Sequence, residues 1–447
     1  MFAATRRTVI RSAASLGLTA PLVACAGGGA KPDPKSVALS GPTSAKVLLF
    51  NNALFTGAQD SLTSLLSQLD PQLKPDYILF PGQIGEFRTK MVAMYSGGDV
   101  PDAQWIHPSI TSLSASKKLL KPLEDYARQD KTTPISEFYP GLLQYFRWQE
   151  QTYALPWYNP GYSIVYNKTL LDQRGVTPPD RLEKDGKWNW DAYLSTLRDL
   201  TRGSAGDPAR TIGLHPISTN LDWICAWIWE NGGDVFSKDA KKCVVNEAAA
   251  VEALQWYADL YLRYQVVNFG AAITPDFQNG FKSGRIGMKQ ANKEQTAPAE
   301  KDLAEVSFAL GMAPIPKGKA GRANRVGTLG FGVANNAPNG DAGWRWVRFV
   351  SGPQAAAVFM KNLSTLPVRP RFAQLPEFPQ SMNPWENKDY WLEAPTTARA
   401  LAQPGSYNEI ATLWNTTWAD ILAQKGTVKA LVDDFARQAN AMIAQEG

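Results

Sequence analysis

Residues 76–107 read DYILFPGQIGEFRTKMVAMYSGGDVPDAQWIH and predict a strand, a helix and a second strand in succession. The β-rich run 76–80 and a polar turn are followed by apolar residues at helical spacing, namely Phe87, Met91, Val92 and Tyr95. Gly97-Gly98 ends this helix, and residues 103–107 form the next strand.

The residues before this stretch repeat the same pattern. Residues 46–50 (KVLLF) form a short β-rich run, and Leu62, Leu65 and Leu66 then recur at helical spacing. The resulting β-α-β-α-β alternation predicts an α/β lobe with a largely parallel sheet.

A second lobe follows in the sequence. Residues 153–157 and 162–167 predict two strands that lead into a stretch with its own helices, among them one over 218–231. Strand character returns at 308–315 and 330–334, and several helices finish the chain. This late return to strands predicts that the two lobes are discontinuous in sequence.

Composition and charge exclude several classes of function. The 447 residues are 44% hydrophobic and 19% charged, which is typical of a globular protein with a large core. The formal net charge is +5, and it is +2 without the first 24 residues, which hold three arginines and no acid. Such a near-neutral chain without a basic block does not fit a nucleic-acid-binding protein. His107 and His215 are the only histidines, which argues against a histidine-based zinc site.

The amino terminus reads as an export signal. Arg6 and Arg7 followed by an apolar run over 12–24 resemble a twin-arginine signal peptide, and this run is too short to span a bilayer. The run ends in Leu-Val-Ala-Cys, which resembles a lipobox with Cys25 as the acylated residue. Residues 1–24 are therefore expected to be the signal peptide, and residues 25–44, rich in Gly, Ala, Pro, Ser and Lys, a lipid-anchored flexible tether.

Two cysteines remain after Cys25, namely Cys225 and Cys243. An exported protein enters an oxidising compartment, so these residues can form a disulfide. Two separately packed thiols are the alternative, and the sequence leaves the choice open.

Six short motifs together resemble a known family. They are SGGDVPD at 96–102, YALPW at 153–157 followed by YNK at 166–168, WNWD at 188–191, NGGD at 231–234, FKSGRIGM at 281–288 and LPVR at 366–369. In this order, behind a lipoprotein-like signal, they resemble extracellular solute-binding proteins of carbohydrate ABC transporters, the maltose-binding-protein-like group. The resemblance covers essentially the whole mature chain.

The resemblance implies an α/β, two-lobed periplasmic-binding-protein fold of type II with three hinge crossings. The crossings are expected near 157–162, 313–316 and 366–369. Lobe one is then 45–158 with 313–366, and lobe two is 159–312 with 367–447. A ligand in such a fold lies outside the carboxyl ends of the strands, in the cleft between the lobes.

A sugar presents apolar ring faces and a rim of hydroxyls, so its site needs aromatic platforms and planar polar side chains. The chain holds 15 Trp, 15 Tyr and 18 Phe. From strand ends we expect Asn52, Trp105 and His107 at the cleft, with a turn or core role as the alternative. Trp105 and His107 are two apart and so share a face of their strand.

The resemblance adds further candidates, by position alone. Aromatic or polar ligand contacts are implied for Trp157 and Tyr158 at the hinge, Asp222 and Trp223 at a helix start, Asn292, Gly330, Phe331, Arg369 and Tyr407. Core packing remains the alternative for the aromatic residues, and pairing with a carboxylate for Arg369.

The resulting functional hypothesis is a non-catalytic, monomeric receptor without cofactor or metal, which delivers a sugar or oligosaccharide to an ABC permease from the outer face of the cell membrane. Glycerol-phosphate-type or other polar solutes on the same fold are the first alternative. A secreted glycoside hydrolase is the second, since such an enzyme needs a pair of carboxylates and the sequence leaves this pair open. The motifs of serine hydrolases, zinc proteases and phosphate-binding loops are absent.

Overall fold

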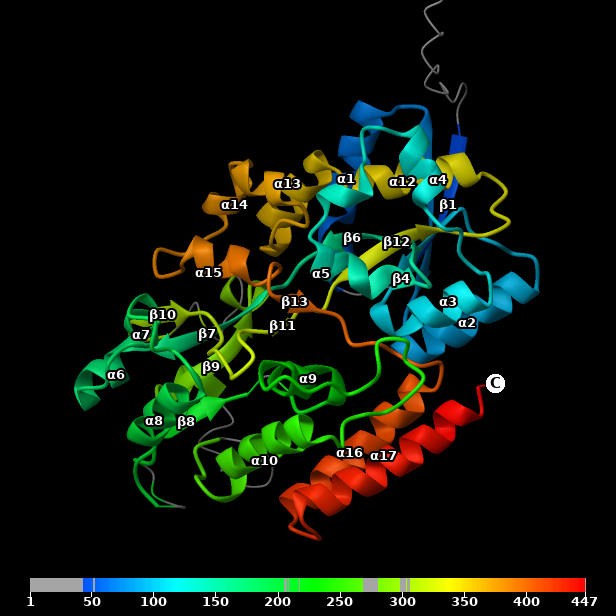
Figure 1. Ribbon diagram of the computed structural model, residues 1–447. Coiled ribbons are helices and arrows are strands. Elements are labelled where there is room, and N and C mark those ends of the chain that lie inside the picture. The colour runs from blue at the N-terminus through cyan, green and yellow to red at the C-terminus, as the bar shows by residue number, and fades with distance from the viewer. Residues whose placement is uncertain are drawn as a thin grey trace, which may run out of the picture. The chain divides into compact units, whose positions relative to one another are not determined.

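The first lobe is built on a five-stranded sheet. In the computed structural model, residues 43–50, 53–204, 207, 209–216, 218–267, 280–297, 303 and 306–446 are described. The sheet has the order β2-β1-β3-β12-β6 (Figure 1). Its strands are β1 (Thr43–Phe50), β2 (Leu73–Phe80), β3 (Ala103–Ile106), β6 (Leu155–Tyr158) and β12 (Leu329–Val333). β1 pairs in parallel with β2 and β3, which confirms the predicted β-α-β alternation, while β12 runs antiparallel to β3 and β6.

Helices connect and cover these strands. They are α1 (Ala53–Leu69), α2 (Ile84–Ser96), α3 (Thr111–Ser116), α4 (Glu124–Gln129), α5 (Pro140–Leu143), α12 (Gly340–Val350), α13 (Pro353–Leu363) and α14 (Glu377–Gln380). α12 packs across all five strands of the sheet. Every residue of β3, β6 and β12 is buried, as expected for strands covered on both faces.

The second lobe has a smaller sheet of four strands in the order β10-β7-β9-β8. They are β7 (Tyr162–Asn167), β8 (Ile212–His215), β9 (Ile286–Asn292) and β10 (Leu310–Ala313). Its helices are α6 (Lys168–Arg174), α7 (Pro179–Lys184), α8 (Trp190–Leu200), α9 (Leu221–Glu230), α10 (Ala248–Leu262), α16 (Tyr407–Leu422) and α17 (Val428–Ala444). α9, α10, α16 and α17 pack on one another and share a second, separate hydrophobic core with α8. The two sheets, each with its own core, are the two lobes that the sequence predicts.

The chain crosses between the lobes at three places in the described residues. The first crossing runs from β6 to β7, and the second runs from β10 to β12 through the short strand β11 (Asn324–Arg325). β11 pairs in parallel with β13 (Ala398–Arg399), where the third crossing lies.

The sequence predicts the third crossing at 366–369, about thirty residues before β13. Leu366 does contact the first crossing, where its backbone N–H donates to the carbonyl oxygen of Asn159 (2.8 Å). However, Phe372, Phe378 and Trp391 remain in the core of the first lobe, and Leu401 is the first residue after β13 in the other core. The segment 370–398 thus has apolar contacts with the first lobe. It also contacts the second lobe, where α15 (Lys388–Glu393) packs on β7 and Glu386 pairs with Lys293.

Gly161 sits in the first crossing and needs to be glycine. Its φ of +53° lies in the left-handed region, and a Cβ would collide with the Leu366 side chain. Gly161→Ala is expected to lower the free energy of unfolding by about 2 kcal/mol, measured by urea denaturation. Gly186 is the matched control, because its φ is +70° and nothing lies within 4 Å of its Cβ position. Equal losses in the two variants would show that the packing at the crossing is not tight.

Cys225 and Cys243 are free thiols, so they do not form a disulfide in this structure. The Cys225 thiol donates to the carbonyl oxygen of Asp222 within α9 (3.2 Å). The backbone N–H of Cys243 donates to Asn440 of α17 (2.8 Å), and burial raises the pKa of its thiol to about 11. Each cysteine is packed in its own surroundings.

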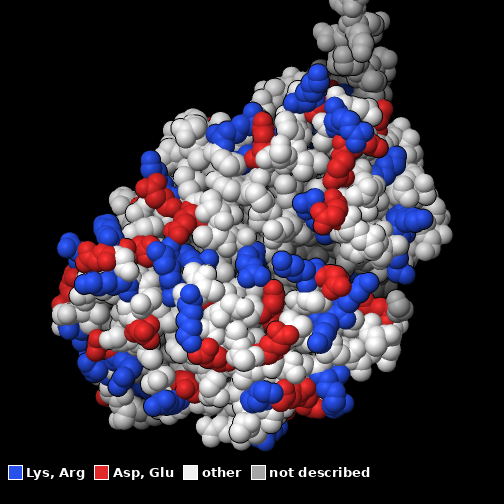
Figure 2. Space-filling view, in the orientation of Figure 1, with Lys and Arg blue, Asp and Glu red and all other residues white. Residues whose placement is uncertain are grey.

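The surface shows no block of one charge on the face drawn in Figure 2, where basic and acidic side chains alternate. This agrees with the near-neutral net charge of the chain after its first 24 residues. No helix in the described ranges is long and apolar enough to cross a membrane. The expected signal peptide, the tether and Cys25 lie outside the described residues.

Candidate functional site

The larger of two neighbouring cavities lies between the lobes and has a volume of about 190 Å³. The first lobe contributes the first residue of α2, the residues that follow β3, and Tyr145. The second lobe contributes the start of α9 and residues of α16 and of the segment before it. The lining residues include Ile84, His107, Ser109 and Tyr145 from the first lobe, and Asn220, Asp222, Gln403, Tyr407 and Asn415 from the second. The wall thus combines aromatic rings with amide, hydroxyl and carboxylate groups.

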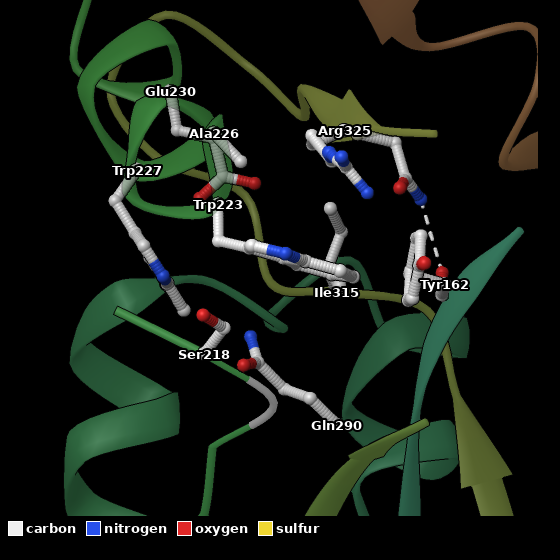
Figure 3. A pocket seen from close by; sticks show the side chains of 10 residues that line it. Tyr162, Ser218, Trp223, Ala226, Trp227, Glu230, Gln290, Ile315 and Arg325 are labelled. Atoms are coloured by element: carbon white, nitrogen blue, oxygen red, sulfur yellow. Dashed lines mark hydrogen bonds between the residues drawn. The ribbon is translucent and has the colours of Figure 1, made fainter. Parts of the chain in front are cut away.

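The smaller cavity, of about 30 Å³, lies beside it in the second lobe. Its apolar wall consists of Tyr162, Trp223, Ala226, Trp227 and Ile315, and its polar groups come from Ser218, Glu230, Gln290, Asn324 and Arg325 (Figure 3). In Figure 3 the Trp223 ring is seen edge-on, with Arg325 on one side and Ser218 and Gln290 on the other. Trp223 therefore presents a flat apolar face to polar partners.

Arg325 of β11 holds these groups together. Its Nη2 lies 2.5 Å from Oδ2 of Asp222, and its guanidinium carbon lies 4.3 Å from the centre of the Trp223 ring. The rings of Trp223 and Tyr162 form a T-shaped pair with their centroids 4.5 Å apart. Because the side chain of Arg325 is only 12% exposed, this ion pair is shielded from water.

Glu230 places a buried acid beside the smaller cavity. It accepts hydrogen bonds from Nε1 of Trp190 (2.7 Å) and from the backbone N–H of Ala323 (3.4 Å). Burial raises the pKa of Glu230 well above its ordinary value of 4.5. A neutral acid at this position can donate a hydrogen bond as well as accept one.

His107 is a neutral imidazole in the wall of the larger cavity. Its Nδ1 accepts a hydrogen bond from the backbone N–H of Ser109 (3.2 Å) and lies 2.8 Å from the hydroxyl of Ser109. Burial, and secondarily the charge of Arg325, lowers the pKa of His107 from 6.5 to about 4. The site therefore gains no positive charge from this residue at neutral pH.

This pKa has a consequence for stability against pH. Between pH 6.5 and 4 the unfolded chain binds a proton at His107 that the folded chain does not, so the free energy of unfolding falls as the pH is lowered. His107→Gln is expected to make this fall shallower, as measured by urea denaturation at pH 7, 6 and 5. Since all other titrating groups are shared, identical pH slopes would show that His107 is not held neutral.

The chain matches the model of one known protein family. A family model described as "Bacterial extracellular solute-binding protein" matches residues 81–357, which is more than half of the chain. This chain belongs to that family. Comparison with curated proteins finds no match.

Solved structures share the two-lobed fold of this solute-binding protein. An ABC substrate-binding protein from Listeria monocytogenes, in complex with cycloalternan, superposes with a TM-score of 0.73 at 19% identity, covering 90% of this chain and 99% of that one. The cyclic α-maltosyl-1,6-maltose binding protein from Arthrobacter globiformis gives 0.74 at 19% identity, covering 91% and 100%. The GacH receptor of Streptomyces glaucescens, solved unliganded and with acarbose, gives 0.68 at 20% identity, covering 90% and 99%.

Four of the residues expected at the cleft of this solute-binding protein line its cavities. They are His107, Asp222, Trp223 and Tyr407. Asp222 and Trp223 begin α9 and Tyr407 begins α16, as the sequence indicated. Their side chains converge because both helices start at the boundary between the lobes.

The expected aromatic platforms of the first lobe are core residues instead. Trp105 is 2% exposed and stacks on Phe50, and Trp157 is 1% exposed against Phe359. Phe331 is fully buried against Trp346. Helices cover both faces of their sheet, so a place at a strand end does not expose these rings.

Four other candidates line neither cavity. Tyr158 is buried, and its carbonyl accepts a hydrogen bond from Thr328 (2.6 Å). A Cβ at Gly330 would meet Phe146, so this glycine packs in the core. Asn292 caps a turn, where its Oδ1 accepts from the backbone N–H of Gln295. Arg369 is 1% exposed and pairs with Glu137 (3.3 Å), which is the carboxylate alternative. Asn52 lies outside the described residues.

Four cavity residues were not predicted from the sequence, namely Arg325, Tyr162, Gln290 and Glu230. Arg325 belongs to none of the six motifs. Its place between two predicted strands, 308–315 and 330–334, could have indicated a position at the cleft. Tyr162 opens a strand directly after the first crossing, and Gln290 lies two residues before the Asn292 that was chosen.

Proposed function

We propose that this protein is the sugar receptor of an ABC importer, and that it holds a sugar or oligosaccharide between its lobes. The observation that carries the proposal is the Trp223 face, which lies beside the planar polar groups of Arg325 and Asp222 at the boundary of the lobes. A pyranose ring stacked on the indole would bury its C–H face, while its hydroxyls would reach these planar groups. Structural neighbours solved with carbohydrate ligands support the same reading.

The charge of the site favours an uncharged ligand over a phosphate. Among the described lining residues of both cavities, Arg325 is the one Lys or Arg, and Asp222 already pairs with it. His107 adds no charge, because its pKa is lowered to about 4. A phosphate would have to compete with Asp222 for its only cation.

The proposed mechanism is closure without chemistry. A ligand that contacts both walls of the larger cavity binds the closed form more tightly and shifts the lobes toward it. The closed form would then dock on the membrane permease and release the sugar unchanged. Export through the twin-arginine signal and anchoring through acylated Cys25 complete the proposal, since a tethered monomeric receptor stays near its permease.

A thermal-shift screen tests this function. Oligosaccharides, monosaccharides, polyols and sugar phosphates are each added to the purified protein. A sugar at one hundred times its Kd should stabilise the folded state by about 2.7 kcal/mol, which raises the melting temperature by about 3 °C. A rise with sugar phosphates only, or with none of the compounds, would contradict the proposal.

A further inference from the structure

Arg325 lies between the two cavities. Among the described residues it is the one that lines both, with Asp222 on the side of the larger cavity and Trp223 on the side of the smaller one. The larger cavity opens between the lobes, whereas the smaller one extends into the second lobe toward Gln290. The side chain of Arg325 therefore forms part of the wall of each cavity.

Several contacts fix the side chain in this position. The ion pair with Asp222 orients one edge of the guanidinium, and the Trp223 ring supports its face. Gly327 makes room, because a Cβ there would collide with Nη1 of Arg325. A wall held by an ion pair, a ring and a missing Cβ is more rigid than an exposed arginine.

We propose that Arg325 is a specificity-determining residue that divides the sugar cleft into two compartments and so limits the length of the oligosaccharide. This inference rests on the proposed sugar-binding function. A short sugar fills one compartment without moving Arg325. A longer one has to break the Asp222–Arg325 pair or leave its further units in solvent, so additional units contribute little affinity.

Calorimetric titration with glucose and with maltooligosaccharides of two to five units tests the length limit. Arg325→Ala removes the wall and the cation, whereas Arg325→Met removes the cation but keeps most of the bulk. Affinity should stop rising with length in the wild type and in Arg325→Met. In Arg325→Ala it should continue to rise, by about tenfold for each further ring that gains a stacking partner. The same length profile in both variants would overturn the proposal.

Arg322→Gln is the matched control for the loss of a buried arginine in the same segment. Arg322 is 4% exposed and pairs with Glu183 and Glu393, but it lines neither cavity. This variant should keep the wild-type length profile, and a changed profile would count against a role specific to Arg325.

Ligand-free crystal structures separate this proposal from the proposed function. If no glucan binds the wild type, glucans are not the ligand. The ligand-free structures still test whether Arg325 separates the two cavities. A single continuous cavity in Arg325→Ala, with two cavities in Arg325→Met, supports the division by Arg325. Two separate cavities in Arg325→Ala overturn it, because another side chain would then form the wall.

Discussion

Glu386→Gln is expected to lower the free energy of unfolding by about 3–5 kcal/mol, because it leaves the ammonium of Lys293 buried without a counter-charge. Both side chains are fully buried, and Nζ of Lys293 lies 3.2 Å from Oε2 of Glu386. The same ammonium donates to the carbonyl oxygen of Ser381 (2.8 Å). Urea denaturation of the purified chain measures the loss.

The position of this pair explains why the loss should be large. The backbone N–H of Lys293 donates to the carbonyl oxygen of Pro160 in the first crossing (2.8 Å). Glu386 accepts from Nε1 of Trp391 (2.7 Å), which belongs to the core of the first lobe. Removing the carboxylate charge therefore disturbs the packing where the lobes are joined.

Two controls separate the unpaired charge from a general loss of contacts. The double variant Lys293→Met with Glu386→Gln removes both charges and should recover more than half of the lost stability. Asp185→Asn breaks the exposed pair of Asp185 with Arg181 and should cost less than about 1 kcal/mol. A loss below about 1 kcal/mol for Glu386→Gln itself would contradict the assignment of a buried ion pair.

Trp223→Ala is expected to weaken sugar binding by about 3 kcal/mol, or roughly 100-fold, because it removes the aromatic platform of the proposed site. Isothermal titration with the best sugar of the thermal screen measures the change in Kd. The folded state should persist, since Trp223 lies at the first turn of α9 rather than among the buried residues of that helix.

Trp148→Ala is the matched control. Trp148 is half-buried in the first lobe, where it forms a T-shaped pair with Tyr153, and it lines neither cavity. Its replacement should leave the Kd within about threefold of the wild-type value, which corresponds to less than about 1 kcal/mol. Equal losses in both variants would show that the indole of Trp223 is not a binding platform.

The two lobes could be predicted from the sequence because their strands and helices follow from local patterns of apolar residues and glycines. The run 76–80, the spacing of Phe87 and Met91, and Gly97-Gly98 each predict the element that forms there. The discontinuity could also be predicted, since strands reappear late in the chain. The end of the first lobe could not, because it depends on where Phe372 and Trp391 find apolar partners, which is a matter of long-range packing.

The candidate site was predictable where a helix start places the side chain, and at His107, which directly follows β3. Asp222 and Tyr407 begin helices whose first turns meet the cleft, so their position in the sequence nearly fixes their place in the fold. Trp157 and Phe331 are on strands whose two faces are both covered, and sequence does not tell a covered face from a cleft face. Arg325 depends on a two-residue strand and on the missing Cβ of Gly327, neither of which has a periodic signature.

The most direct test of the account is a crystal structure of the protein with the sugar that gives the largest thermal shift. The account predicts electron density for the sugar in the cavities that meet at Arg325, with hydroxyls within hydrogen-bond distance of Asp222 in the larger cavity and a ring on Trp223 in the smaller one. Density confined to another surface, such as the groove beside Trp385 and Tyr390, would contradict it.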